Sequence, residues 1–281
     1  MPSKYRVLAL SIPSAISILS TQALGKIVLE PGEQQQDMRY NLEPDEETQF
    51  RGIGSIQCKN DEGGVESTGF IAMNNRMVVT VAHYRFSFKE KHVIEATFNS
   101  SDCLFLLRNP TGSQVFFASP FEEIASGWKD SASQPDHRDW ALLRLKEAAP
   151  ITAVPLDFAQ PTPSWLRSSE ISNLYRSYTV GYSGSNQNPY QKTIAIDCKI
   201  KNAKTSKSII RHACDTGPGS SGSPILIDID GRPFVFAINT ADGTGNFNIG
   251  LKIGPELVAA SGSKVPSISQ MISSKKVFGG R

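Results

Sequence analysis

Three segments of the sequence hold the residue types that nucleophilic catalysis by a serine requires. An apolar run ends in Thr80-Val81-Ala82-His83, Asp139 directly precedes the apolar run Trp140–Leu145, and Ser221 lies in the segment Gly219–Pro224. A serine hydroxyl is too weak an acid to attack unaided, so an imidazole must take its proton and a carboxylate must fix the tautomer of that imidazole. We therefore predict His83, Asp139 and Ser221 as a catalytic triad.

Each segment also has a purely structural interpretation. His83 alone would be a hydrogen-bonded residue at the rim of a sheet, and a glycine-serine stretch alone would be a linker. Asp139 would simply end a loop, and Asp136 is a rival carboxylate three residues earlier. We prefer Asp139 because it abuts the apolar run, and the flanking Cys214 and Pro224 argue against a flexible linker.

The residues around Ser221 also suit the stabilisation of an oxyanion. Gly219 lies two residues before Ser221 and can adopt backbone angles closed to other residues. A tight turn there directs two backbone N–H groups at a developing negative charge, which is often the largest electrostatic contribution to acyl transfer. We predict that the amides of Gly219 and Ser221 form an oxyanion hole.

Short β-branched and aromatic runs separated by turn residues must position these side chains, and this pattern predicts antiparallel strands. In the first half the predicted strands are Gly52–Gln57, Thr68–Met73, Met77–Ala82, His92–Phe98, Leu104–Leu107, Gln114–Ala118 and Trp140–Leu145. In the second half they are Ser177–Tyr182, Thr193–Ile200, Ile209–Cys214, Pro224–Ile229, Phe234–Thr240 and Asn248–Ile253. We predict two all-β units, 52–150 and 151–281, with barrels favoured because closure removes exposed edges. A short C-terminal helix is expected at Pro266–Ser274.

The three segments resemble the motifs of trypsin-like serine proteases, in the same order of His, Asp and Ser. The resemblance is carried by Thr80–His83, Asp139-Trp140-Ala141-Leu142-Leu143 and Gly219-Ser220-Ser221-Gly222-Ser223-Pro224, and it spans Gly52 to Ile253. The last motif, together with Asp37-Met38-Arg39, is similar to the bacterial branch that includes the glutamyl endopeptidases. The resemblance implies two perpendicular antiparallel six-stranded barrels of the chymotrypsin type with the active site between them. It also implies polypeptide substrates and no metal or organic cofactor.

Two positions depart from the family pattern. The residue before the nucleophile is Ser220 rather than the aspartate that pairs with a new N-terminal ammonium in digestive enzymes, so that ion pair cannot form. The cysteine that often follows the catalytic histidine is replaced by Tyr84.

The sequence leaves open whether the enzyme prefers basic or acidic side chains in its substrates. The candidate specificity residues are Asp215, Thr216, Asn239 and Thr240. Asp215 lies six residues before Ser221, the position that in trypsin holds the carboxylate at the floor of the pocket. This resemblance implies a preference for Lys or Arg side chains, although Asp215 can also be a structural residue beside Cys214. Thr216 recurs in relatives that prefer acidic residues, but the run that ends in Asn239-Thr240 lacks the histidine those enzymes use. We lean toward basic side chains.

The N-terminal region predicts an exported protein. Lys4 and Arg6 precede the apolar run Val7–Leu19, which is typical of a signal peptide over residues 1–23 and too short for a membrane anchor. Residues 24–51 are predicted to be a pro-segment or an N-terminal arm. The net charge of +2 indicates no nucleic-acid partner. We expect a secreted or periplasmic monomer.

An exported chain can keep disulfides, and four cysteines allow three pairings. Pairing Cys198 with Cys214 would close a favourable hairpin, which leaves Cys58 and Cys103. Four reduced thiols, or a zinc site with His212, are the alternatives, and zinc is disfavoured because no short Cys-x-x-Cys pair exists.

Two other functional classes could use a similar set of residues. An α/β hydrolase needs Gly-x-Ser-x-Gly and the order Ser, acid, His, which this chain lacks. A catalytically inactive protease fold that serves as a secreted binding module is the remaining competitor, although such proteins usually lose a member of the triad.

Overall fold

The structure is a computed structural model, which describes residues 39–271 apart from 61–62, 90–91, 97, 129–137, 162–175, 185–187, 197, 203–207, 243–246, 263 and 269. The predicted signal peptide therefore lies outside the described residues. Within these ranges, no helix is both long and apolar enough to span a membrane.

The first half of the chain folds into a closed barrel of six strands in the order β2-β3-β4-β9-β8-β7. These strands are β2 (Ile53–Asn60), β3 (Gly63–Ile71), β4 (Met77–Thr80), β7 (Cys103–Arg108), β8 (Val115–Ser126) and β9 (Ala141–Leu145). A separate hairpin pairs β5 (Phe86–Lys89) with β6 (His92–Ala96). The predicted strand His92–Phe98 thus belongs to this hairpin and not to the barrel.

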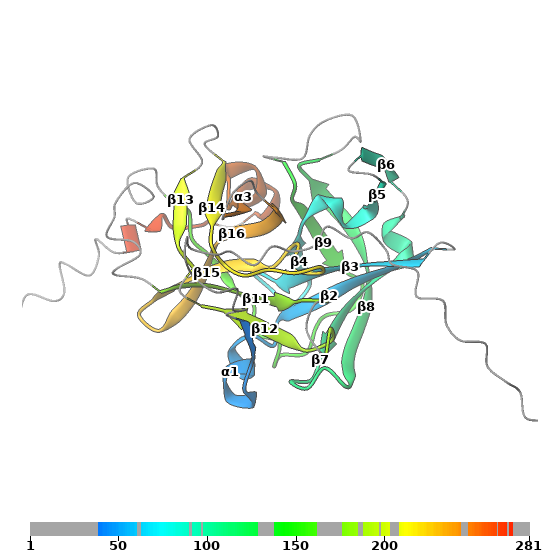
Figure 1. The fold of residues 1–281 in the computed structure, drawn as a ribbon, viewed down its shortest axis with the longest axis horizontal. Coiled ribbons are helices and arrows are strands. Elements are labelled where there is room, and N and C mark those ends of the chain that lie inside the picture. Colours follow the sequence, from blue (N-terminus) through cyan, green and yellow to red (C-terminus); the bar gives the residue numbers. More distant parts are fainter. Residues whose placement is uncertain are drawn as a thin grey trace, which may run out of the picture.

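The second half forms a nine-stranded, curled sheet with the order β1-β12-β11-β15-β16-β17-β14-β13, in which β10 also pairs with β16. Its strands are β1 (Arg39–Asn41), β10 (Asp157–Phe158), β11 (Ser177–Tyr182), β12 (Lys192–Ala195), β13 (Ile200–Asn202), β14 (Ile209–His212), β15 (Pro224–Ile229), β16 (Arg232–Asp242) and β17 (Asn248–Lys252). Figure 1 shows this sheet beside the first barrel. The prediction of an all-β, two-barrel architecture is confirmed, with the second barrel built as a strongly curved sheet.

One hydrophobic cluster joins the two halves. It contains Val79 and Leu142 from the first barrel, and Val180, Leu226 and Ile238 from the second sheet, all fully buried. A second cluster fills the interior of the first barrel and includes the large side chains of Phe105, Phe121 and Trp128. Because removal of apolar surface from water is the dominant favourable contribution to folding, the shared cluster holds the two sheets against each other.

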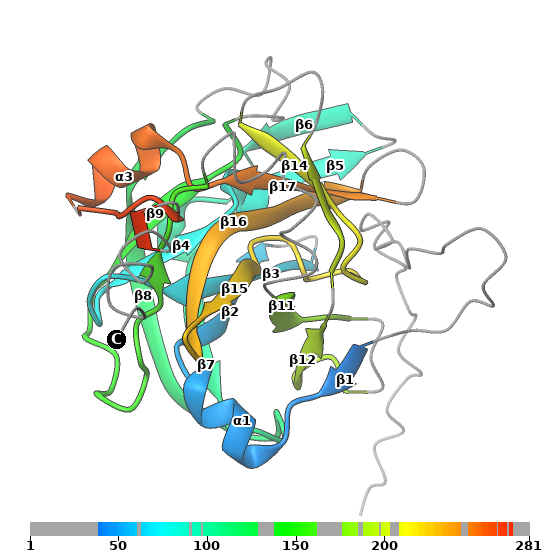
Figure 2. The same cartoon turned by 90° about the vertical axis from the view of Figure 1, so that its left-hand side faces the viewer.

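Part of the predicted pro-segment or N-terminal arm is packed onto the second sheet. Strand β1 pairs with β12, and the short helix α1 (Pro44–Gln49) follows it. Leu42 and Phe50 are buried in the cluster that joins the two halves. Figure 2 shows β1 beside β12 and α1 below these two strands.

Helical structure is confined to short segments in the described part of the chain. The helix α3 (Pro255–Ser261) directly follows β17 and its C-cap is Gly262, whose φ of 68° is in the left-handed region. This helix lies before the predicted range Pro266–Ser274, of which residues 268, 270 and 271 are helical and 272–274 lie outside the described residues.

Two disulfides connect neighbouring strands or the loops beside them. Cys58 bonds to Cys103, its partner in the register of β2 and β7, and Cys198 bonds to Cys214. This is the pairing that the hairpin argument favoured. Since all four sulfurs are used, the zinc alternative with His212 has no thiolate ligands.

Candidate active site

His83 and Asp139 meet because their strands are neighbours in the first barrel. Strands β4 and β9 pair with Thr80 opposite Ala141, and the chain beyond β4 turns into the 3₁₀ helix η1 (Ala82–Arg85). His83 Nδ1 lies 2.7 Å from Asp139 Oδ2, and the His83 backbone N–H donates to Asp139 Oδ1 over 2.9 Å. The side chain of Asp139 is 3% exposed and that of His83 is 17% exposed.

This geometry fixes both the position and the tautomer of the imidazole. The ionised carboxylate only accepts hydrogen bonds, so Nδ1 carries the proton that it donates to Asp139, and Nε2 is left to accept another. The rival carboxylate, Asp136, lies outside the described residues.

Ser221 lies in a tight turn between Cys214 and β15. Its hydroxyl donates to the Thr240 carbonyl over 3.4 Å. Gly219 and Gly222 both have φ of +88°, a conformation that strains any other residue. At Gly222 a side chain is also excluded by space, because a Cβ atom would lie 1.9 Å from the Thr68 carbonyl oxygen.

The backbone amides of this turn fall into two groups. Ser220, Gly222 and Ser223 donate their N–H groups to the carbonyls of Gly217, Asn239 and Ser220 respectively, over 2.8–3.0 Å. The N–H groups of Gly219 and Ser221 donate to no acceptor among the described residues. These are the two amides that the sequence predicted as oxyanion donors.

Thr68 and Ser220 hold the turn in place, a role that the sequence did not reveal for either residue. Thr68 lies on β3 of the first barrel. Its hydroxyl donates to the Gly219 carbonyl over 2.8 Å, and the Thr68 backbone N–H donates to the Ser221 carbonyl over 2.8 Å. The Ser220 hydroxyl accepts from the Gly217 N–H and donates to the Tyr182 carbonyl. Ser220 therefore braces the turn without the ion pair that an aspartate makes in digestive relatives.

A polar cluster packs behind η1, at the position of the missing cysteine. The Tyr84 hydroxyl donates to Glu123 Oε2 over 3.1 Å, and Arg85 Nη1 lies 2.9 Å from Glu123 Oε1. Burial raises the pKa of Glu123, and the Arg85 guanidinium opposes that shift. Burial and the Glu123 charge also raise the pKa of Tyr84.

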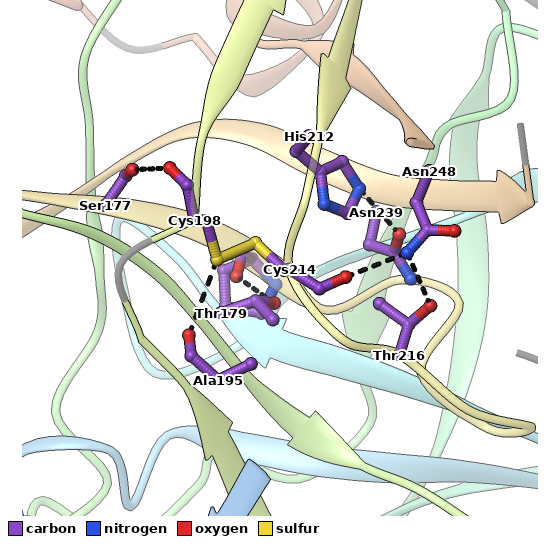
Figure 3. Close-up of a disulfide and its surroundings, with 10 residues drawn as sticks. Ser177, Thr179, Ala195, Cys198, His212, Cys214, Thr216, Asn239 and Asn248 are labelled. Carbon is purple, nitrogen blue, oxygen red and sulfur yellow. Dashed lines mark hydrogen bonds between the residues drawn. A yellow bond between two sulfur atoms is a disulfide. The ribbon is translucent and has the colours of Figure 1, made fainter. Parts of the chain in front are cut away.

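The four predicted specificity residues are all buried near the turn. Asp215 and Thr216 lie between Cys214 and the turn, and Asn239 and Thr240 lie on β16. Asn248 on β17 donates from Nδ2 to the Cys214 carbonyl over 2.8 Å and to Thr216 Oγ1 over 3.1 Å, as Figure 3 shows. The sequence contained no signal for this role of Asn248, because the pairing of β17 with β14 and β16 that places it there is a property of the fold.

His212 is a buried histidine in the same region. Its ring lies beside Asn239 (Figure 3), with 3.0 Å between His212 Nε2 and Asn239 Oδ1. Burial lowers the pKa of His212 to about 4, and the hydrogen bond to Asn239 opposes that shift. His212 is therefore uncharged at neutral pH.

Comparison with known proteins identifies the family. The model of the trypsin-like peptidase domain matches residues 67–238, more than half of the chain. The chain belongs to the trypsin-like peptidase family. A comparison with curated protein sequences finds no match.

Solved structures with this fold include proteins described as proteases and one described as an inactivated protease paralogue. A Glu endopeptidase in complex with MPD is 15% identical with a TM-score of 0.55, over 81% of this chain and 96% of its own. The thermostable serine protease AL20 from an extremophilic microorganism is 16% identical with a TM-score of 0.52, over 73% and 91%. The scabies mite inactivated protease paralogue S-I1 is 11% identical with a TM-score of 0.55, over 76% and 95%. At these sequence identities the similarity to these structures shows a shared fold only.

Proposed function

We propose that this member of the trypsin-like peptidase family is a secreted serine endopeptidase, with His83, Asp139 and Ser221 as its triad. The observation that carries the proposal is the double hydrogen bond from His83 to the buried carboxylate of Asp139. A histidine that only filled a barrel rim would not need its backbone and its ring to bind the same carboxylate. Both disulfides suit an oxidising compartment.

Each group then has one task in the hydrolysis of a peptide bond. His83 Nε2 takes the Ser221 proton as the hydroxyl attacks the carbonyl carbon, and the Gly219 and Ser221 amides bind the oxyanion. His83 returns the proton to the leaving amine, which leaves an acyl-enzyme on Ser221. A water molecule attacks this ester with His83 again as the base, and the acid product leaves.

A catalytically inactive binding module is the second candidate, and a specific comparison supports keeping it. One structural neighbour of this chain is described as an inactivated protease paralogue. The fold therefore does not by itself decide activity, and the chemistry at Ser221 has to be measured.

The deciding experiment is fluorophosphonate labelling of the processed protein beside its Ser221→Ala variant. An endopeptidase is labelled, loses the label in the variant and cleaves a peptide library. A folded wild-type protein that takes up no label would instead be a binding module.

The same peptide library assigns the specificity residues. Cuts after Lys or Arg that disappear in Asp215→Ser would identify Asp215 as the acceptor for a basic side chain. Cuts after Glu that disappear in Thr216→Val would identify Thr216 as the donor for an acidic one.

A further inference from the structure

Asn239 holds the backbone on both sides of Ser221. Its side-chain Nδ2 donates to the Ser220 carbonyl over 2.9 Å. Its backbone carbonyl accepts from the Gly222 N–H over 2.8 Å, and its backbone N–H donates to the Ser223 carbonyl over 2.9 Å. The proposed nucleophile therefore lies between residues that one asparagine of β16 binds directly.

The bond to the Ser220 carbonyl bears on the oxyanion hole because of peptide geometry. The Ser220 carbonyl and the Ser221 N–H belong to the same peptide unit, which is planar and trans, so the two groups point in opposite directions. A donor that binds the carbonyl on one side thus aims the N–H to the other side, away from β16.

The second proposed oxyanion donor is held in the same manner. The Gly219 N–H shares its peptide unit with the Pro218 carbonyl, which accepts from the Gly184 N–H over 2.6 Å. Each of the two peptide units is therefore held through its carbonyl. At Pro218 the donor is a backbone amide with a fixed direction. The Ser220 carbonyl accepts from the Ser223 N–H within the turn and from the Asn239 side-chain amide outside it, and only the second of these donors can rotate.

His212 removes that freedom. Because Asn239 Nδ2 faces the Ser220 carbonyl, Oδ1 is the atom that faces His212 Nε2 at 3.0 Å. An amide oxygen only accepts, so Nε2 carries the proton and donates it. A rotation of the Asn239 amide by half a turn would set its oxygen against the Ser220 carbonyl, which is repulsive. It would also set the NH₂ group against the imidazole N–H, unless the proton moved to His212 Nδ1, a buried atom without a hydrogen-bond partner among the described residues.

We propose that His212 and Asn239 are positioning residues that aim the Ser221 N–H at the oxyanion. His212 holds the Asn239 amide in the orientation that binds the Ser220 carbonyl, and Asn239 in turn fixes the peptide unit between Ser220 and Ser221. This inference rests on the proposed peptidase function, and it gives Asn239 a role other than contact with the substrate side chain.

The test measures steady-state kinetics on the peptides identified by the library, together with the rate of fluorophosphonate labelling. Asn239→Asp keeps the shape of the side chain but sets a carboxylate against the Ser220 carbonyl. We expect kcat to fall by about 10²–10³-fold, the typical cost of losing one oxyanion donor, with KM nearly unchanged. The labelling rate should fall in parallel, because the phosphonyl oxygen uses the same two amides.

Tyr178→Phe is the control for the loss of a buried hydrogen bond. Tyr178 is buried on β11 of the same sheet, but its hydroxyl donates to Asp228 Oδ1 over 2.7 Å and not to the catalytic turn. We expect this variant to keep the kcat, the KM and the labelling rate of the wild type. Asn239→Ser, which removes the amide without adding charge, repeats the test, and thermal unfolding of each variant shows that it is folded.

His212 is tested by rescue. His212→Phe removes the donor to Asn239 and should lower the labelling rate, and His212→Gln, which keeps an N–H donor, should restore part of it. Folded Asn239→Asp and Asn239→Ser variants with the kcat and labelling rate of the wild type would overturn the proposal. So would a rise in KM alone, which would make Asn239 a specificity residue. An unlabelled wild-type protein would instead refute the peptidase function itself.

Discussion

A buried ion pair between Glu47 and Lys192 joins the N-terminal arm to the second sheet, and the loss of either partner alone should destabilise the protein. Lys192 Nζ on β12 contacts Glu47 Oε1 on α1, and the two side chains are 2% and 1% exposed. The ammonium also donates to the carbonyls of Phe50 and Ile53, over 3.1 and 3.4 Å. Burial lowers the pKa of Lys192, and the Glu47 carboxylate opposes that shift.

Glu47→Gln removes the negative charge and leaves the ammonium buried with neutral acceptors. Removal of one partner from a buried pair costs about 3–5 kcal/mol. For a domain of this size, each kcal/mol lowers the melting temperature by about 2–4 °C, so a decrease of about 10 °C is expected. Lys192 can reduce this cost by losing its proton, and the decrease should then be smaller at high pH.

Urea titration and thermal unfolding followed by circular dichroism measure this change. Glu46→Gln is the matched control, because Glu46 lies on the same helix and its side chain accepts from the Glu43 N–H, a contact that glutamine can keep. We expect it to stay within about 0.5 kcal/mol of the wild type.

A double variant separates charge imbalance from lost packing. Glu47→Met with Lys192→Met removes both charges and fills a similar volume, so most of the stability lost in Glu47→Gln should return. Two results would contradict the cost of an unpaired buried charge. One is a free energy of unfolding for Glu47→Gln that is less than about 1 kcal/mol below that of the wild type, and the other is a double variant that is no more stable than Glu47→Gln.

Three further predictions concern the pH dependence, the turn and a disulfide. Since the pKa of His212 falls from 6.5 to about 4 on folding, the unfolded chain takes up its proton first, and stability is lost as the pH falls from about 6.5 to 4. At pH 5 the loss is about 2 kcal/mol, and urea titrations at pH 7 and pH 5 should show it in the wild type and not in His212→Gln. Thr68→Val removes the donor to the Gly219 carbonyl, so kcat on peptide substrates should fall and stability should drop by about 1–3 kcal/mol; an unchanged kcat would contradict the role of this contact. The double variant Cys198→Ser with Cys214→Ser removes a disulfide that spans 16 positions. Its free energy of unfolding in a urea titration should be about 3 kcal/mol below that of the wild type. An unchanged free energy of unfolding would mean that packing alone holds the hairpin.

The elements that position His83 and Asp139 were predictable because the relevant contacts are made by neighbouring strands. Strong apolar runs marked β4 and β9, and the family pattern placed the histidine after one and the aspartate before the other. The assignment of the triad and of its oxyanion donors stays a prediction, which labelling at Ser221 tests. The register that sets Thr80 opposite Ala141 came only from the fold.

Contacts between residues far apart in sequence were not predictable. Thr68 reads as an ordinary strand residue, yet its hydroxyl reaches Gly219, 151 positions away. Glu47 lies in a polar segment typical of an exposed arm, yet it is buried against Lys192, 145 positions away. Polar residues carry no periodicity that reveals burial, so their partners are decided by how the two sheets meet.

The sequence by itself determined the chemistry available to this protein: a histidine, a carboxylate and a serine in the order of the trypsin-like peptidases, four cysteines, and two sets of strands. Composition and local patterns suffice for this, because side-chain chemistry and strand periodicity are local properties. The tertiary structure decided which polar groups hold the catalytic turn. His212 and Asn239 became partners only when β14 and β16 took their places beside β17, since an amide is oriented by the groups that packing sets around it.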